Sequence, residues 1–280
     1  MTPSTNAFKG KLAIPLRAMR LLSTAMNRTL EARPVLKNPV AAFLFFLDLP
    51  EPFNLEDCWF SLDGSPFCAR HTDWLAVDET TLREEYRPVL IGIRGIECPY
   101  VLDLGANIGM FSLKAFQLNP TAVVHAIEPG RATFQVLETN RRANPQFAWR
   151  TLHGAVWTAD GEVGFEEVAV ASTSAHVDMN SATTVLGIRL GTILSSISRP
   201  VIDLVKMDIE GAEEAVLRDS IGVLGRIRNL AVEVHPNRCD PREVGAILEG
   251  AFPRVVRIAR ERSSKPLILA SRCQSPIDTK

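Results

Sequence analysis

Residues Val101–Leu113, VLDLGANIGMFSL, decide the fold that the sequence predicts. The first half is a short apolar run that contains one acid, Asp103, and it indicates a buried strand. The second half turns at Gly105 and continues with the spacing of a helix. Gly105 allows a tight turn and a close approach to a ligand, and Gly109 allows the helix to pack against the strand. The stretch therefore predicts a strand, a glycine turn and a helix that open a ligand crevice.

A second predicted strand, Ala122–Ile127, also ends in an acid, Glu128. Glu128 follows Asp103 by 25 residues, close to the spacing at which an acid reaches the ribose of a bound nucleotide. A dinucleotide fingerprint needs glycines where this chain has Asn107 and Met110. This argues against the interpretation as a nicotinamide-dependent oxidoreductase, although that enzyme class stays open as the alternative. A strand and helix joined by glycine also occur in proteins without a nucleotide ligand.

Further along the chain, two more predicted strands, 203–207 and 230–234, end beside Asp208, Glu210 and His235. Parallel strands place these side chains at the same edge of the sheet as the two earlier acids. An acid or imidazole there can take the proton that a hydroxyl loses when it attacks, so these three are the candidate catalytic residues. Crowded carboxylates need a cation, a shared proton or a positive ligand. Spacing alone does not establish a divalent metal, and we predict no metal ligands.

Four segments together resemble the FkbM family of S-adenosylmethionine-dependent methyltransferases. They are VLDLGANIG, HAIEP, DLVKMDIEGAEEAVL and LAVEVHP. The similarity runs from about residue 69 to 259, and residues 206–213 are its most family-specific piece. It implies an α/β Rossmann-like class I methyltransferase fold, with a seven-stranded, mostly parallel sheet, helices on both faces and an antiparallel last strand. It also implies O-methylation of a hydroxyl on a small molecule, sugar or glycan precursor.

The resemblance further implies individual roles in binding S-adenosylmethionine. The loop 105–109 and Asp103 would hold the methionine end and Glu128 the ribose, while the loop after the third strand would border the adenine. A tyrosine near the cofactor is also implied. The expected cofactor-binding residues are Tyr86, Asp103, Gly105, Ala106, Asn107, Gly109, Glu128, Ala155 and Val156.

Composition narrows the partners and the compartment. The chain has 280 residues, 46% of them hydrophobic, which is enough for a sizeable core. Lysine and arginine total 31 against 32 for aspartate and glutamate, so no basic excess favours nucleic acid. The five cysteines lack C-x-x-C spacing, which argues against disulfide and metal frameworks and favours the cytoplasm. The methyl acceptor and the oligomeric state stay open.

The N-terminal part differs from the rest. A basic amphipathic helix is predicted after Pro15, and it either packs on its own domain or lies on an anionic membrane surface. The apolar run Val40–Leu47 is too short to cross a bilayer, so we expect a buried helix or strand and no transmembrane segment. Asp63-Gly64 predicts a β-hairpin over 58–70. We therefore divide the chain into an extension (1–70), a methyltransferase domain (71–270) and a tail (271–280).

Two other segments carry expectations. The sequence predicts a helix over 82–87 that Pro88 ends. Residues 162–190 are polar with alternating patterns, which predicts short strands. These strands either line the acceptor pocket or form a solvated excursion on the surface. A third function also stays open, in which the fold is kept without catalysis and the basic N-terminus binds a partner; the intact acids at the crevice argue against it.

Overall fold

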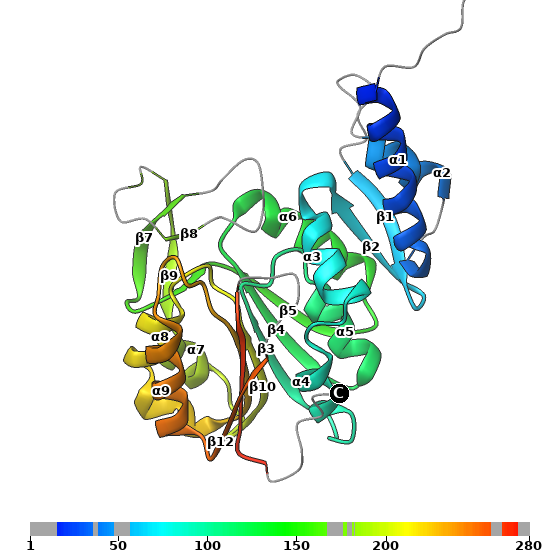
Figure 1. Cartoon of the computed structure of the whole chain (residues 1–280). Coiled ribbons are helices and arrows are strands. Elements are labelled where there is room, and N and C mark those ends of the chain that lie inside the picture. Colours follow the sequence, from blue (N-terminus) through cyan, green and yellow to red (C-terminus); the bar gives the residue numbers. More distant parts are fainter. Residues whose placement is uncertain are drawn as a thin grey trace, which may run out of the picture.

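The computed structural model describes residues 16–35, 39–47, 57–166, 176–177, 181, 183–258 and 265–273. Its centre is a seven-stranded sheet in the order β12-β13-β11-β10-β3-β4-β5 (Figure 1). The strands are β3 Tyr100–Leu104, β4 Val123–Glu128, β5 Ala148–His153, β10 Ile202–Met207, β11 Ile227–Glu233, β12 Arg254–Ile258 and β13 Leu267–Ser271. Only β13 runs antiparallel to its neighbours. The predicted class I methyltransferase fold and its closing hairpin are confirmed.

Two helical layers bury the faces of this sheet. Helices α5 (Met110–Leu118) and α6 (Arg131–Ala143) cover one face, and α7 (Leu190–Ser196), α8 (Glu213–Asp219) and α9 (Pro241–Ala251) cover the other (Figure 1). Every residue of β3 and β10 is buried, because central parallel strands are covered on both sides. Most of these residues are apolar, and the charged exceptions are Asp103, Asp203 and Lys206. The short 3₁₀ segment η5 (Ile221–Arg226) connects α8 to β11.

The N-terminal extension packs on α6. It contains α1 (Leu16–Glu31), η1 (Arg33–Val35), α2 (Pro39–Leu47) and the hairpin of β1 (Asp57–Leu62) and β2 (Ser65–Arg70). Asp63 and Gly64 both have positive φ, as a tight two-residue hairpin turn requires, so the hairpin prediction is confirmed. The Asn140 side chain accepts from Cys68 N at 2.6 Å and donates to Cys68 O at 3.0 Å. These bonds fasten the hairpin to the helix.

The predicted helix over 82–87 is wrong. The segment instead contains η2 (His71–Asp73), α3 (Trp74–Val77), the π-helical turn η3 (Asp78–Leu82), α4 (Arg87–Leu90) and η4 (Ile91–Ile93). A turn at Glu84, with φ of 50°, separates η3 from α4. Pro88 lies in the first turn of α4, where its missing N–H breaks no helical hydrogen bond, so it begins a helix instead of ending one.

A second sheet is inserted in the sequence between β5 and β10 of the main sheet, and its strand order is β6-β9-β7-β8. Its strands are β6 Ala155–Trp157, β7 Gly161–Glu166, β8 His176–Val177 and β9 Thr184–Arg189. The short strands predicted within 162–190 are confirmed, although 167–175, 178–180 and 182 lie outside the described residues. The predicted tail is also outside them from residue 274. Within the described ranges, every helix is too short or too polar to cross a bilayer.

Gly105→Ala tests the junction between β3 and the end of β10. Gly105 has φ of 73°, and a Cβ there would lie 1.7 Å from the backbone oxygen of Asp208. Because backbone cannot move aside cheaply, we expect the free energy of unfolding to fall by about 1–3 kcal/mol in urea denaturation. Gly191→Ala is the control, since it meets open space. Equal stability of the two variants would contradict the close approach.

Candidate functional site

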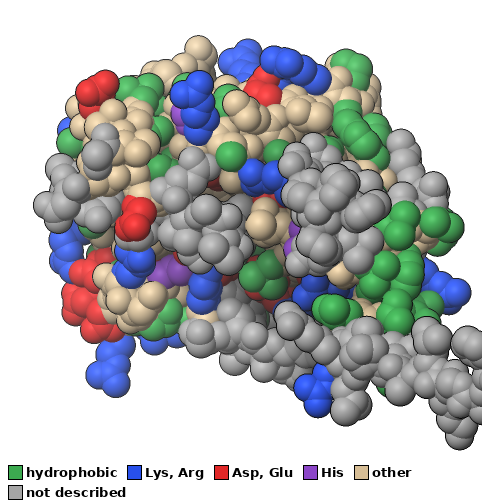
Figure 2. All heavy atoms as spheres, turned by 90° about the horizontal axis from the view of Figure 1, so that it is seen from above, with side chains coloured by type: hydrophobic (Ala, Val, Ile, Leu, Met, Phe, Trp, Pro, Cys, Tyr) green, Lys and Arg blue, Asp and Glu red, His purple; other side chains and the backbone are tan. Residues whose placement is uncertain are grey.

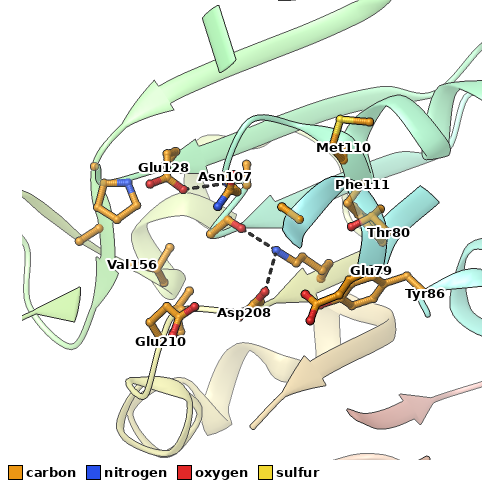
Figure 3. Close-up of a pocket in the computed structure, with 18 of the residues that line it drawn as sticks. Glu79, Thr80, Tyr86, Asn107, Met110, Phe111, Glu128, Val156, Asp208 and Glu210 are labelled. Carbon is orange, nitrogen blue, oxygen red and sulfur yellow. Dashed lines mark hydrogen bonds and ion pairs between the residues drawn. The ribbon is translucent and has the colours of Figure 1, made fainter. Parts of the chain in front are cut away.

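A cavity lies at the carboxyl ends of β3, β4 and β10 (Figure 3). In open α/β sheets this is the edge at which small-molecule ligands bind. Nine of the twelve predicted site residues line it: Tyr86, Gly105, Ala106, Asn107, Glu128, Ala155, Val156, Asp208 and Glu210. Glu128 and Asn107 lie at one end of the view, and Glu79 and Tyr86 lie at the other. The parallel sheet therefore brings together most of the residues that the sequence singled out.

The loop after β3 and Glu128 form one hydrogen-bonded unit. The N–H groups of Gly105 and Ala106 donate to Ile127 O at 3.0 and 2.9 Å. Asn107 N donates to Glu128 Oε2 and Gly130 N to Glu128 Oε1, both at 2.8 Å. Burial raises the pKa of Glu128 to about 7, and these backbone donors oppose the shift. A buried carboxylate of this kind is suited to accept hydrogen bonds from ligand hydroxyls, and its charge responds to pH near neutrality.

Lys206 connects this loop to the acids beyond β10. Its ammonium donates to Gly105 O at 2.5 Å and lies 3.6 Å from Asp103 Oδ1 and 3.5 Å from Asp208 Oδ2. Burial opposes the charge of Lys206, but Asp208 and Asp103 outweigh burial and raise its pKa above the usual value. Two of these contacts appear as dashed lines in Figure 3. The lysine thus fixes the glycine turn and one catalytic candidate together.

Asp103 is one of the predicted cofactor-binding residues. It is fully buried and does not line the cavity. Its carboxylate accepts from the Ser112 hydroxyl at 2.7 Å and faces the Lys206 ammonium. The structure therefore gives no direct support for contact between Asp103 and the methionine end of a cofactor, and that role stays a prediction. Asp103 acts on the cavity through Lys206.

Gly109 also does not line the cavity. It precedes α5, and a Cβ there would lie 2.5 Å from the Trp149 ring and 2.7 Å from Leu137. The expected close packing is present, against β5 and α6, and the cofactor-binding role of Gly109 stays a prediction.

The acids after β10 lie on a strained turn. Glu210 has φ of 54° and Gly211 has φ of 105°, a conformation that costs energy for a residue with a side chain. The N–H groups of Ile209 and Gly211 both donate to Glu213 Oε1 at 3.1 Å. Glu213 has no exposed surface. This buried carboxylate holds the turn that presents Asp208 and Glu210 to the cavity.

His235 is buried between carboxylates and does not line the cavity. Its Nδ1 is 2.9 Å from Glu213 Oε1, and its Nε2 is 3.0 Å from Glu210 Oε2 and 3.7 Å from Asp208 Oδ1. Burial disfavours the charged ring, but the bonds to Glu210 and Glu213 and the charge of Asp208 raise its pKa to about 10. This raised pKa favours the charged imidazolium at neutral pH, a form suited to holding the neighbouring acids in place. The role of His235 as a catalytic base stays a prediction.

Two functional residues were missed from the sequence. Glu213 looks like an ordinary first-turn helix acid, and only its place in the family-specific block 206–213 sets it apart from Glu214. Lys265 precedes β13, and its ammonium lies 3.5 Å from Glu233 Oε1 and 3.6 Å from Glu210 Oε1. No motif marks Lys265. Glu233 also accepts from the Tyr86 hydroxyl at 3.0 Å.

These contacts supply the partner cations that the crowded acids require. Lys206, Lys265 and protonated His235 lie among Asp208, Glu210 and Glu233. One ligand atom each from Asp208, Glu233 and His235 lies within 4.8 Å of the others, so these residues could hold a metal ion if His235 lost its proton. Lys206, Lys265 and the His235 ring already place positive charge beside these acids, as a metal ion would.

Comparison with known proteins identifies related chains. The model of the methyltransferase FkbM domain matches residues 103–261. Hexuronic acid methyltransferase AglP of Haloferax volcanii is 29% identical over 150 residues, 53% of this chain and 61% of that protein. The 31-O-demethyl-FK506 methyltransferase FkbM of Streptomyces tacrolimicus is 31% identical over 189 residues, 54% of this chain and 70% of that protein. The chain thus spans less than two thirds of the first relative.

Among solved structures, WbdD is similar with a TM-score of 0.48 and 16% identity, covering 71% of this chain and 42% of that one. The methyltransferase domain of METTL16 also has a TM-score of 0.48, with 13% identity, and covers 90% of this chain and 92% of that one. We therefore base the fold assignment on the strand order of the central sheet.

Glu213→Ala and Glu214→Ala form a matched test of the buried pair of Glu213 and His235. Removing Glu213 leaves His235 and the strained turn without their shared partner, so we expect a loss of about 3–5 kcal/mol in the free energy of unfolding. Glu214 is a partly exposed partner of Arg218, and its removal should cost about 0–1 kcal/mol. Urea denaturation at neutral pH measures both. Similar losses for the two variants would contradict the role of Glu213.

Proposed function

The chain belongs to the FkbM family of methyltransferases, and on that premise we propose that it transfers a methyl group from S-adenosylmethionine to a hydroxyl of a sugar or other small molecule. One observation carries the proposal: the buried ammonium of Lys206 contacts both the glycine turn and Asp208. The ligand-binding loop and a candidate base are thereby held on one cavity. We further propose that residues 71–270 form the methyltransferase unit and 1–70 an extension packed on it.

The lining residues fit the cofactor. Glu128 would accept hydrogen bonds from the ribose, since its carboxylate is held at the cavity by Asn107 N and Gly130 N. Ala155 and Val156 offer an apolar border for the adenine, and Gly105, which also lines the cavity, would border the methionine end. S-adenosylmethionine, when bound, supplies an electrophilic methyl group on a sulfonium. Carboxylates at the cavity favour such a positive ligand.

Asp208 is the proposed base for the acceptor hydroxyl. Its Oδ1 accepts no hydrogen bond from the described part of the chain, and the residue lines the cavity. Asp208 would take the proton that the acceptor hydroxyl loses on attacking the methyl group that the cofactor would supply. Such general-base help contributes about 10²- to 10⁴-fold. Alignment of the acceptor with the methyl group supplies much of the remaining acceleration.

The acceptor class rests on relatives and on the cavity wall. One relative is named for a hexuronic acid, which supports a sugar acceptor, and the other for the 31-O-demethyl form of FK506, which supports a hydroxyl acceptor. Glu79 and Thr80 of η3 and Phe165 and Val177 of the second sheet line the cavity. These residues combine polar and apolar contacts, as a sugar or macrocycle requires. They also support the expectation that part of 162–190 borders the acceptor.

We propose a cytoplasmic location because the cysteines are not paired in disulfides. All five cysteines are free, and three of them, Cys58, Cys68 and Cys239, are buried. Proteins that fold in oxidising compartments more often pair their cysteines. No specific contact favours the nicotinamide alternative or a fold without catalysis.

Calorimetric titration of S-adenosylhomocysteine and NAD tests the cofactor. Glu128 should become ionised between about pH 6 and pH 8, so affinity for S-adenosylhomocysteine should rise roughly tenfold over that range. Glu128→Gln should bind about 10- to 150-fold more weakly at the higher pH and lose most of this dependence. NAD should not bind. Binding of NAD alone would overturn the proposed function.

Asp208→Asn tests the chemistry. We expect the rate of methyl transfer to fall by about 10²- to 10⁴-fold, while the affinity for S-adenosylhomocysteine changes by no more than about twofold. Transfer of labelled methyl to hexuronic acid glycosides and macrolide alcohols provides the assay. Glu214→Gln, at the outer start of α8, is the control and should retain wild-type rates. An Asp208→Asn enzyme of normal rate would remove this residue from the mechanism.

A further inference from the structure

Helix α1 exposes a continuous apolar face. Met19, Leu22, Met26 and Leu30 follow one another at intervals of three or four residues, so they lie on one side of the helix. Their exposed fractions are between 42% and 55%. Among residues 19–32, the buried ones, Ala25 and Ala32, are small. The larger apolar side chains are therefore left uncovered by the packing of α1 on α2.

Helix α2 adds to the exposed apolar surface of the extension. Phe45 and Phe46 are buried against the hairpin and Trp74, whereas Val40 and Leu44, one helical turn apart, are exposed. Figure 2 shows hydrophobic side chains gathered at the right, the side on which the N-terminal helices lie in Figure 1. Clustered exposure of this kind marks an interaction surface, unlike single exposed residues.

The charge of this segment is opposite to that of a phospholipid surface. Residues 1–30 contain five basic residues and no acid, although the whole chain has a net charge of −1. Arg20 and Arg28 belong to α1 itself, and Lys9 and Lys11 precede the described residues. Two copies of so basic a segment would repel each other across a shared interface. An anionic bilayer offers both counter-charge and an apolar layer at one surface.

We propose that α1 and α2 hold this protein on an anionic membrane surface, with Met19, Leu22, Met26 and Leu30 inserted at the boundary between headgroups and acyl chains. The attachment is peripheral. The apolar face supplies the inserted area and the basic residues supply the attraction to anionic headgroups. This inference does not depend on the proposed methyl transfer.

Vesicle sedimentation of the full-length protein tests the attachment. Wild type should bind mixed phosphatidylglycerol–phosphatidylcholine vesicles and should bind pure phosphatidylcholine vesicles about tenfold or more weakly. The double variant Met19→Glu/Met26→Glu should lose about tenfold or more in affinity for the mixed vesicles. Arg20→Glu/Arg28→Glu should lose affinity for the mixed vesicles only. Ile221→Glu is the control, because Ile221 is equally exposed but lies in η5.

Three results would overturn the proposal. They are absence of wild-type binding to the mixed vesicles, equal binding by Met19→Glu/Met26→Glu and wild type, and a concentration-dependent dimer that this double variant abolishes. The last result would assign the face to a second copy of the chain. Calorimetric binding of S-adenosylhomocysteine and thermal unfolding show that each variant is folded, so loss of vesicle binding is separable from failure of the active site.

Discussion

A single buried ammonium, that of Lys206, holds the candidate site together. Removing a charge from water is costly, and the cost is met here by one carbonyl and two carboxylates from three different segments. Gly105 belongs to the turn after β3, Asp103 to β3 itself and Asp208 to the loop after β10. Because these groups satisfy the same cation, the turn, the strand and the loop cannot shift independently. Direct pairing of β3 with β10 gives this arrangement its register.

The remaining charges follow the same principle of mutual compensation. His235 lies between Glu210 and Glu213, which raise its pKa, and Lys265 lies between Glu210 and Glu233. Asp208, Glu210 and Glu233 therefore each have a positive group of the chain beside them. The strained turn at Glu210 persists because Glu213 accepts hydrogen bonds from its backbone. The geometry of the lining acids thus depends partly on Glu213 and His235, which do not line the cavity.

Local pattern and topology made much of this predictable. The apolar runs of β3, β4 and β10, each followed by an acid, were sufficient to place Glu128, Asp208 and Glu210 on one cavity, because parallel strands share an edge. Other features depend on contacts between segments that are distant in sequence, which periodicity does not encode. They are the burial of Glu213, the raised pKa of His235 and the position of Lys265 beside the acids. Pro88 was misjudged for a related reason: proline is compatible with both the end and the first turn of a helix.

The origin of the cavity wall has a consequence for how this enzyme diversifies. Glu79, Thr80 and Tyr86 line the cavity, yet they precede the FkbM-domain match, and Lys265 follows it. The cavity wall is thus encoded partly inside and partly outside the matched stretch. Substitutions in the flanking stretches can therefore reshape that wall while every residue of the matched domain is kept.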